Sequence, residues 1–213
     1  MKKTALIIIA SLFFTNLILG QEPSPDFAGK LQFGLKIGAN LSNVYDATGE
    51  AFTADSKIGI VSGVFAVIPV ADLFGLQPEI LISQKGFNAQ GVFLGSAYKF
   101  KRTSNYIDVP LLVSFKPIPL VTILAGPQYS FLFSQKDEFE SGLLTIQQEQ
   151  DFKNENIRRN MLCFVGGADI NAGHFVLGLR AGWDLFSNAK DDNAGTPRYK
   201  NVWYQASLGF RFF

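Results

Sequence analysis

Residues 202–213 read VWYQASLGFRFF, and alternate side chains along this stretch are apolar. Successive side chains of an extended strand point to opposite faces. One face then carries Val202, Tyr204, Ala206, Leu208, Phe210 and Phe212. The other face carries Gln205, Ser207, Gly209 and Arg211. This two-residue period predicts a β-strand that separates an apolar environment from a polar one.

The same alternation recurs along the chain, and eight strands are predicted in all. In several of them, residues 32–42 and 174–185 for example, the polar residues and the glycines share one face and the apolar residues share the other. The predicted strands are Gln32–Ser42, Lys57–Val70, Leu73–Phe87, Lys99–Lys116, Leu120–Phe133, Ile157–Ala172, His174–Phe186 and Asn201–Phe213. No later segment has the long apolar run of a membrane-spanning helix.

The connections between these strands alternate in length. Those at residues 69–72, 117–119 and 172–173 are tight, whereas the intervening ones are long and polar, and residues 134–156 form the longest and most charged of them. In lipid every backbone N–H and C=O needs an internal partner, so strands cross a membrane only as a closed sheet. Outer-membrane barrels combine short periplasmic turns with long external loops.

We therefore predict an all-β fold, an eight-stranded antiparallel up-and-down transmembrane β-barrel over residues 32–213, surrounded by outer-membrane lipid. Both mature termini are then expected in the periplasm. The alternative is a water-soluble ligand-binding barrel of the lipocalin type, which would place its large apolar side chains inside. Aromatic belts at both edges of an apolar band favour the membrane barrel. The predicted belts comprise Tyr129, Phe131, Trp183 and Tyr204 at the outer edge, and Phe33, Phe115, Phe175, Phe210 and Phe212 at the periplasmic edge.

The first 20 residues have the pattern of a secretory signal peptide. A basic start at Lys2 and Lys3 precedes an apolar stretch, and Gly20 offers a small residue for cleavage. A retained membrane helix is the alternative, although the stretch is shorter than the roughly 20 apolar residues of a span. Residues 21–31 are expected to be a short periplasmic lead-in, and the signal carries no cysteine for a lipid anchor.

Three prolines lie within predicted strands. Pro78, Pro110 and Pro127 each remove one backbone donor from the ladder. Because a closed barrel has no edge strand, we expect a bulge or a local irregularity at each of them.

Several motifs resemble the PorT-like outer-membrane β-barrel family of Bacteroidetes. They are FGLKIGANLS at residues 33–42, LQPEI at 76–80, QKGF at 84–87, YIDVPLL at 106–112, AGP at 125–127 and GFRF at 209–212. The resemblance implies that the three prolines are tolerated in the barrel. It also implies a structural or accessory role linked to protein secretion or assembly, since the namesake is associated with type IX secretion. Barrel-assembly machinery reads an outward aromatic residue at the end of such chains, here Phe212 or the extra Phe213.

Charged residues of both signs occupy strand positions that are predicted to face the barrel interior. They are Lys36, Glu79, Lys85, Asp108, Asp169, Arg180, Asp184 and Arg211. An eight-stranded barrel has an interior that side chains can fill, and buried charges there must pair. We expect a salt-bridge network that plugs the barrel, with a polar conduit or narrow pore as the alternative.

The sequence offers little for catalysis, for metals or for nucleic acid. His174, the one histidine, falls in a predicted periplasmic turn, so no enzymatic activity is expected. Cys163 fits a small buried hydrophobe. No cofactor, metal site or nucleic-acid partner is predicted, because no basic stripe exists and the acidic residues of one outer loop lack the spacing of a calcium loop. These acidic residues are Asp137, Glu138, Glu140, Glu149, Asp151 and Glu155. The alternative function is surface binding or adhesion to an extracellular partner through the long outer loops.

Overall fold

The computed structural model describes residues 29–48, 53–93, 96–141, 144–149, 157–189 and 198–212. Its strands are β1 (Gln32–Thr48), β2 (Thr53–Pro69), β3 (Phe74–Phe93), β4 (Ser96–Ile118), β5 (Val121–Ser141), β6 (Leu144–Glu149), β7 (Asn160–Ala172), β8 (Phe175–Asp184) and β9 (Arg198–Arg211). The predicted signal peptide and most of the predicted lead-in lie outside the described residues. No helix among the described residues is long and apolar enough to span a membrane.

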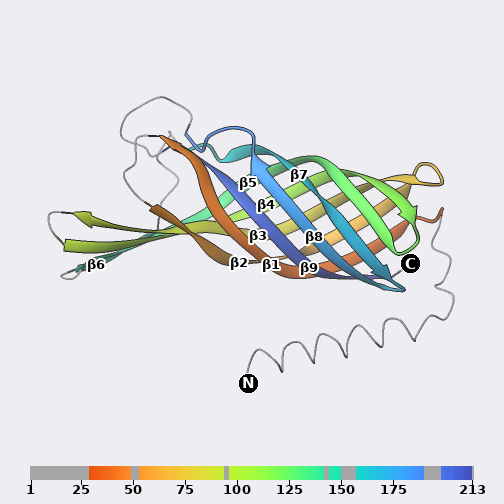
Figure 1. Ribbon diagram of the computed structural model, residues 1–213, viewed down its shortest axis with the longest axis horizontal. Helices are drawn as coiled ribbons and strands as arrows, with labels where there is room; N and C mark the ends of the chain where they lie inside the picture. Colours follow the sequence, from red (N-terminus) through yellow and green to blue (C-terminus); the bar gives the residue numbers. More distant parts are fainter. Residues whose placement is uncertain are drawn as a thin grey trace, which may run out of the picture.

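Eight of the nine described strands close into a ring (Figure 1). Each strand pairs antiparallel with its neighbours in the order β1, β2, β3, β4, β5, β7, β8 and β9, and β9 pairs with β1 to complete the circle. The predicted fold class is confirmed. Closure satisfies the backbone of every strand in the ring through its two neighbours, as a lipid environment requires.

The strands on one side of the barrel are longer than predicted. β3 and β4 remain paired as far as Phe93 and Ser96, so residues 88–93 and 96–98 of the predicted polar connection are strand. β5 likewise continues to Ser141 and forms a hairpin with β6 inside the predicted loop 134–156. Beyond the apolar band a strand has no lipid face, so the alternation that reveals a strand in sequence disappears there.

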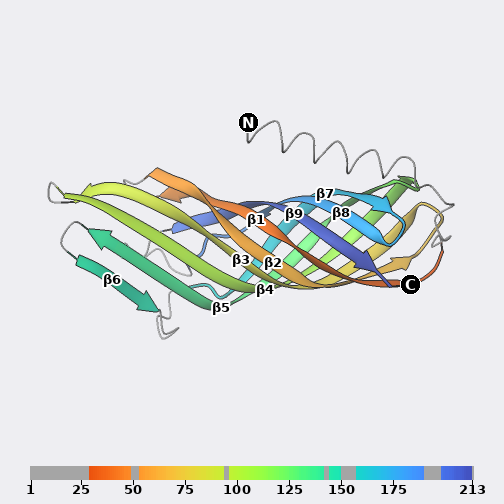
Figure 2. The same ribbon diagram turned by 90° about the horizontal axis from the view of Figure 1, so that it is seen from below.

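The two ends of the barrel differ. The tight turns, the first strand residue Gln32 and the last strand residue Arg211 lie together at one end, on the right in Figure 1. At the other end, the β3–β4 and β5–β6 hairpins extend beyond the remaining strands (Figure 2). We call the parts of these two hairpins that lie beyond the barrel, within residues 88–101 and 134–149, the protruding sheet. It is continuous with the barrel wall, because residues 98–102 of β4 pair with residues 137–141 of β5.

Apolar side chains cover the outside of the barrel and polar ones fill the inside. Ile58 is 73% exposed, Ile37 66% and Leu179 54%, whereas Lys85 is 1% exposed. Water would oppose this distribution, but lipid favours it, because lipid solvates apolar side chains and the inward polar groups can bond to one another. The lipocalin alternative, with an apolar interior, is therefore wrong.

The three prolines cause local irregularities, as expected, but none causes a bulge. The register is the same on both sides of Pro78 and Pro110, and Pro127 pairs with Phe164 within an unbroken ladder. Each proline removes a donor and lies in a short gap of one ladder: Pro78 between β2 and β3, Pro110 between β3 and β4, and Pro127 between β4 and β5. The register shifts occur elsewhere, mostly near the outer edge of the apolar band, for example between Asn105 and Tyr106.

Candidate functional site: the barrel interior and its outer end

Two ion pairs lie in the half of the interior nearest the tight turns. Lys36 Nζ is 2.7 Å from Glu79 Oε1, and Arg180 Nη1 is 2.7 Å from Asp169 Oδ1. Lys36 of β1 reaches across β2 to the Glu79 carboxylate of β3, and its ammonium lies 5.3 Å from the Phe65 ring centre. All four charged side chains are buried. Within each pair, the attraction between the opposite charges compensates for the hydration that each ionised group loses on burial.

Arg211 closes the interior at the tight-turn end. Its guanidinium donates to Gln32 Oε1 and Asn171 Oδ1, each at 3.0 Å, and to the Gly173 carbonyl oxygen at 3.2 Å. These partners come from β1, from β7 and from the turn before β8. Arg211 therefore ties together strands on both sides of β9 at the mouth, beside a cavity of about 70 Å³.

A third ion pair lies deeper in the barrel. Lys85 Nζ is 3.0 Å from Asp108 Oδ2, and Ser83 also donates to this carboxylate. The same ammonium is 3.8 Å from the ring centre of Trp203 and 4.8 Å from that of Tyr106. Lys85 is thus held by one carboxylate and two aromatic faces, which favour a cation through their quadrupoles.

Asp184 is the last residue of β8, at the end away from the tight turns, and has neutral partners. Its carboxylate accepts from Asn201 N at 2.9 Å, from Asn201 Nδ2 at 2.6 Å and from Cys163 Sγ at 3.1 Å. Asp184 and Arg211 are at opposite ends of the β8–β9 pair, so the structure does not bring them together. Of the eight charges singled out in the sequence, six form three direct ion pairs.

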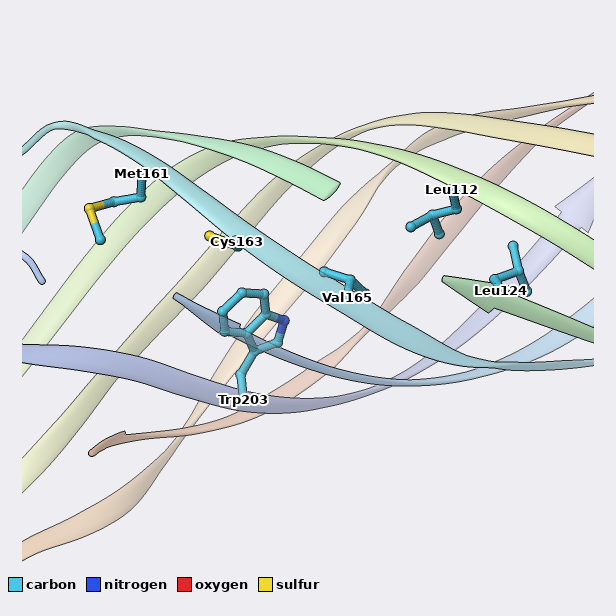
Figure 3. Packing of buried hydrophobic residues seen from close by; sticks show 6 residues of the cluster. All are labelled: Leu112, Leu124, Met161, Cys163, Val165 and Trp203. Carbon is cyan, nitrogen blue, oxygen red and sulfur yellow. The ribbon is translucent and has the colours of Figure 1, made fainter. Parts of the chain in front are cut away.

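The interior also contains large apolar side chains that the sequence analysis did not assign. Trp203, Cys163 and Val165 belong to one buried cluster with Leu112 and Leu124, and the two leucines lie nearer the tight turns (Figure 3). Trp203 packs against β8 at Gly182, where an added Cβ would lie 2.4 Å from the indole ring. Strand parity alone places Trp203 inside, because its neighbours Val202 and Tyr204 face outward.

The end opposite the tight turns carries a further network that the sequence analysis missed. Arg102 binds Asp137 through two hydrogen bonds of 2.8 and 2.7 Å and donates to Tyr199 Oη at 3.0 Å. Burial opposes the charge of Arg102, but its interactions with Tyr199 and Asp137 raise its pKa above the ordinary value. This network connects β4, β5 and β9 where the protruding sheet leaves the barrel.

The surface of the protruding sheet carries a cluster of charged side chains. Lys101 and Lys136 lie 3.1 and 3.2 Å from the two carboxylate oxygens of Glu138. Hydrogen bonds from these lysines lower the pKa of the partly exposed Glu138 carboxyl. Asp137, Glu138 and Glu140, predicted in a loop, therefore lie on β5, and the remaining acidic residues of that group have no described side chains.

The belt residues lie at both edges of the apolar band. At the tight-turn end Phe33, Phe175, Phe210 and Phe212 face outward, and the Phe210 ring contacts those of Phe175 and Phe212. Phe115 packs against Phe74, 5.1 Å between ring centres. At the other edge Tyr129, Trp183 and Tyr204 are exposed, and Phe131 is half-buried. Phe213 lies outside the described residues.

The groups that most often perform catalysis are engaged in structural contacts. His174 lies in the β7–β8 turn, where its Nδ1 is 2.8 Å from the Arg211 carbonyl oxygen and its ring stacks on Phe210. Cys163 is buried and donates to Asp184. Within the part of the chain that the structure describes, no three potential metal ligands come together.

Comparison with known proteins yields one family. The family model described as "Outer membrane protein beta-barrel domain" matches residues 20–189. No curated protein matches the sequence. Among solved structures, Ail of Yersinia pestis in complex with a heparin analogue is 17% identical, with 85% of this chain and 99% of that chain covered and a TM-score of 0.47.

Two further solved structures illustrate the range of similar proteins. Neisserial surface protein A is 10% identical, with 84% of this chain and 97% of that chain covered and a TM-score of 0.47. The outer membrane protease OmpT of Escherichia coli is also 10% identical, with 85% and 96% covered and a TM-score of 0.43.

Proposed function

Because the chain belongs to the family of outer membrane protein β-barrel domains, we propose that it is a plugged barrel that displays its protruding sheet outside the cell to bind another molecule. The observation that carries this proposal is the protruding sheet itself. The barrel already closes without the outer parts of β3, β4 and β5 or the whole of β6, so these segments are not needed to span the membrane.

The proposed orientation follows from the lengths of the connections. Periplasmic turns of outer-membrane barrels are short and their external segments are long. The β2–β3, β4–β5 and β7–β8 turns would then face the periplasm, together with both ends of the barrel domain. A cysteine introduced at Asn88, on the protruding sheet, should react with a membrane-impermeant maleimide on intact cells. One introduced at Asp72, in the β2–β3 turn, should react only after the outer membrane is opened.

The plugged interior predicts an absence of steady conductance. Lys85, Trp203, Leu112 and Leu124 are fully buried inside the barrel, between the cavity at the tight-turn end and a groove on the protruding sheet. We expect purified protein in a planar bilayer to give no stable open-channel current. Lys85→Ala with Trp203→Ala, which removes side chains from the plug, is the variant for comparison. Steady large-pore currents from the unaltered protein would show that the conduit alternative is right.

The edge of the protruding sheet offers a mode of binding. Within the described residues β6 pairs with β5 alone, so its other edge presents backbone N–H and C=O groups. Such an edge can accept an added strand from another chain. The charged side chains of β4 and β5 border it and could select the partner.

Removal of the β5–β6 hairpin tests the surface-binding proposal. A short Gly-Ser turn in place of residues 139–153 should leave the barrel folded, because the ring of eight strands remains closed. Attachment of expressing cells to immobilised glycans and extracellular proteins should fall to the level of cells without the protein. Trimming residues 90–99 of the β3–β4 hairpin is the matched control, since it leaves the β6 edge in place. Heat-modifiable migration in gels reports folding of both variants.

The accessory role in secretion or assembly, with the more specific PorT-like assignment, rests on the sequence resemblance alone and stays a prediction. This role is favoured if cells with the hairpin-deleted protein attach to glycans and extracellular proteins as well as cells with the unaltered protein do. In that case the periplasmic end or the lipid face would carry the function.

A further inference from the structure

One face of the protruding sheet carries its charges in two parallel stripes. Lys99 and Lys101 are two residues apart on β4, and Glu138 and Glu140 are two residues apart on β5, so each couple shares a face of its strand. The register pairs Lys99 with Glu140 and Lys101 with Glu138, which places all four on the same face of the sheet. We call these four residues the charged face. A cationic stripe on it runs beside an anionic one.

The charged face points sideways from the molecule. Lys99, Lys101 and Ile107 lie on the same side of β4, and Ile107 is 39% exposed on the lipid side of the barrel. Figure 1 shows the protruding hairpins extending along the long axis of the molecule, beyond the barrel. The charged face therefore continues the lipid-facing wall past the apolar band, toward a neighbouring molecule in the same membrane.

The opposite face of the protruding sheet packs against the barrel's own residues. Phe100, between the two lysines of β4, points the other way, and its ring centre is 5.9 Å from that of Phe87. The Phe87 ring is in turn 5.3 Å from that of Tyr199 on β9. On the charged face, by contrast, Lys99, Lys101 and Glu140 are exposed, and a groove of about 280 Å³ lies among them. The charged face is thus the one that is open to a second molecule.

The ion pairs within the chain do not use all the capacity of the charged face. Lys101 Nζ is 3.1 Å from Glu138 Oε2, yet the Lys101 side chain remains 50% exposed. Lys99 and Glu140 are direct partners in register and are both exposed. An exposed ion pair contributes little stability by itself, because water solvates both charges well. Donors on the lysines and carboxylate oxygens therefore remain available to another chain.

The two stripes are complementary to a second copy of themselves. A two-fold axis that runs along the strands, between β4 and β5, places β4 of one copy over β5 of the other. Because Lys101 and Glu138 are paired in register, Lys101 then lies opposite the partner's Glu138, and Lys99 likewise lies opposite the partner's Glu140. The symmetry repeats both contacts. An axis along the protruding hairpins also relates two barrels that cross the membrane in the same direction.

We propose that two copies of this chain associate side by side in the membrane through the charged face. Each contact is weak, but both copies are confined to one membrane, which raises their effective concentration. The inference rests on the proposed display of the protruding sheet outside the membrane. It uses the charged face and not the β6 edge, so the attachment experiment can fail while self-association succeeds, and the reverse.

The test measures self-association of the full-length protein in phosphatidylcholine vesicles. Donor-labelled and acceptor-labelled copies carry the dye on a cysteine introduced at Pro119, in the β4–β5 turn, while Cys163 is buried and stays unlabelled. We expect energy transfer above the level of random encounters at the same protein-to-lipid ratio. The transfer should fall in about 0.5 M salt, which screens exposed charges.

A swapped variant separates the complementarity of the stripes from the folding of the sheet. Lys99→Glu, Lys101→Glu, Glu138→Lys, Glu140→Lys exchanges the two stripes and keeps an opposite charge across β4 and β5 at both levels. It should associate with itself as the unaltered protein does. Mixed with unaltered protein it brings like charges together, so half-maximal transfer should need about tenfold more protein per lipid. The matched control, Lys30→Glu with Asp72→Lys, exchanges two exposed charges near the tight turns and should associate normally with unaltered protein.

The two halves of the swap give a second measurement. Lys99→Glu with Lys101→Glu, and Glu138→Lys with Glu140→Lys, should each lose self-association, and a mixture of the two proteins should regain it. Failure of that mixture to associate would overturn the proposal. Absence of transfer in the unaltered protein would do so as well, as would equal transfer whether the swapped variant meets itself or the unaltered protein. Heat-modifiable migration confirms that the barrel of each variant is folded.

Discussion

Lys85→Met is expected to lower the free energy of unfolding by about 3–5 kcal/mol, because it leaves the buried Asp108 carboxylate without its cation. The two groups are 3.0 Å apart and their side chains are 1% and 3% exposed. Methionine is close in length to lysine, so the loss would reflect the unpaired charge more than a cavity. Equilibrium unfolding in urea, with the protein in lipid vesicles, measures the change.

The double variant Lys85→Met, Asp108→Leu is the control for this prediction. A buried ion pair that is replaced as a whole by apolar residues is often neutral in stability. We therefore expect the double variant to be more stable than Lys85→Met. Lys101→Met, which affects an ion pair on the exposed protruding sheet, should leave the unfolding midpoint unchanged. A double variant as unstable as the single one would mean that the charges matter less than the shape of the site.

Leu179→Arg is expected to destabilise the folded barrel by roughly 2–4 kcal/mol, as measured for arginine at the bilayer midplane of other barrels. Leu179 is in the middle of β8, is 54% exposed and faces outward. Its neighbour Arg180 faces inward and pairs with Asp169. Arginine is thus expected to be favourable at the inward position 180 and destabilising at the adjacent outward position 179.

The depth of the substitution provides the control. Leu185 is also outward and 43% exposed, but it follows the end of β8 at the edge of the apolar band. Leu185→Arg should cost about 0–1 kcal/mol, because an arginine near the interface reaches the head groups. Equal costs at the two positions in vesicle unfolding would contradict the assignment of the apolar face to lipid.

Much of this barrel can be predicted from the sequence because two solvents act on alternate residues. Lipid outside and a packed polar interior inside require opposite side chains at successive positions, and the run from Val202 to Phe212 records this requirement directly. Strand parity in turn places Lys36, Glu79 and Arg180 inside. Their parity says nothing about which charges meet, since Lys36 reaches Glu79 across an intervening strand.

The protruding sheet could not be predicted in the same way. Residues 88–101 and 134–149 mix polar residues, glycines and scattered apolar residues on both faces, so their sequence lacks the regular alternation of a membrane strand. Their pairing depends on the strands that continue from the barrel. Local sequence likewise suggested bulges at Pro78, Pro110 and Pro127. The ladder stays in register there because neighbouring residues hold each strand from both sides.

The sequence by itself therefore determined the number of membrane strands, their faces and the positions of the tight turns, since these follow from the local contrast between lipid and interior. Only the tertiary structure decided the partners of the interior charges, the ninth strand and the network of Arg102, Asp137 and Tyr199. Those features bring together residues far apart in the chain, and the distances between these residues depend on the register between neighbouring strands of the closed ring.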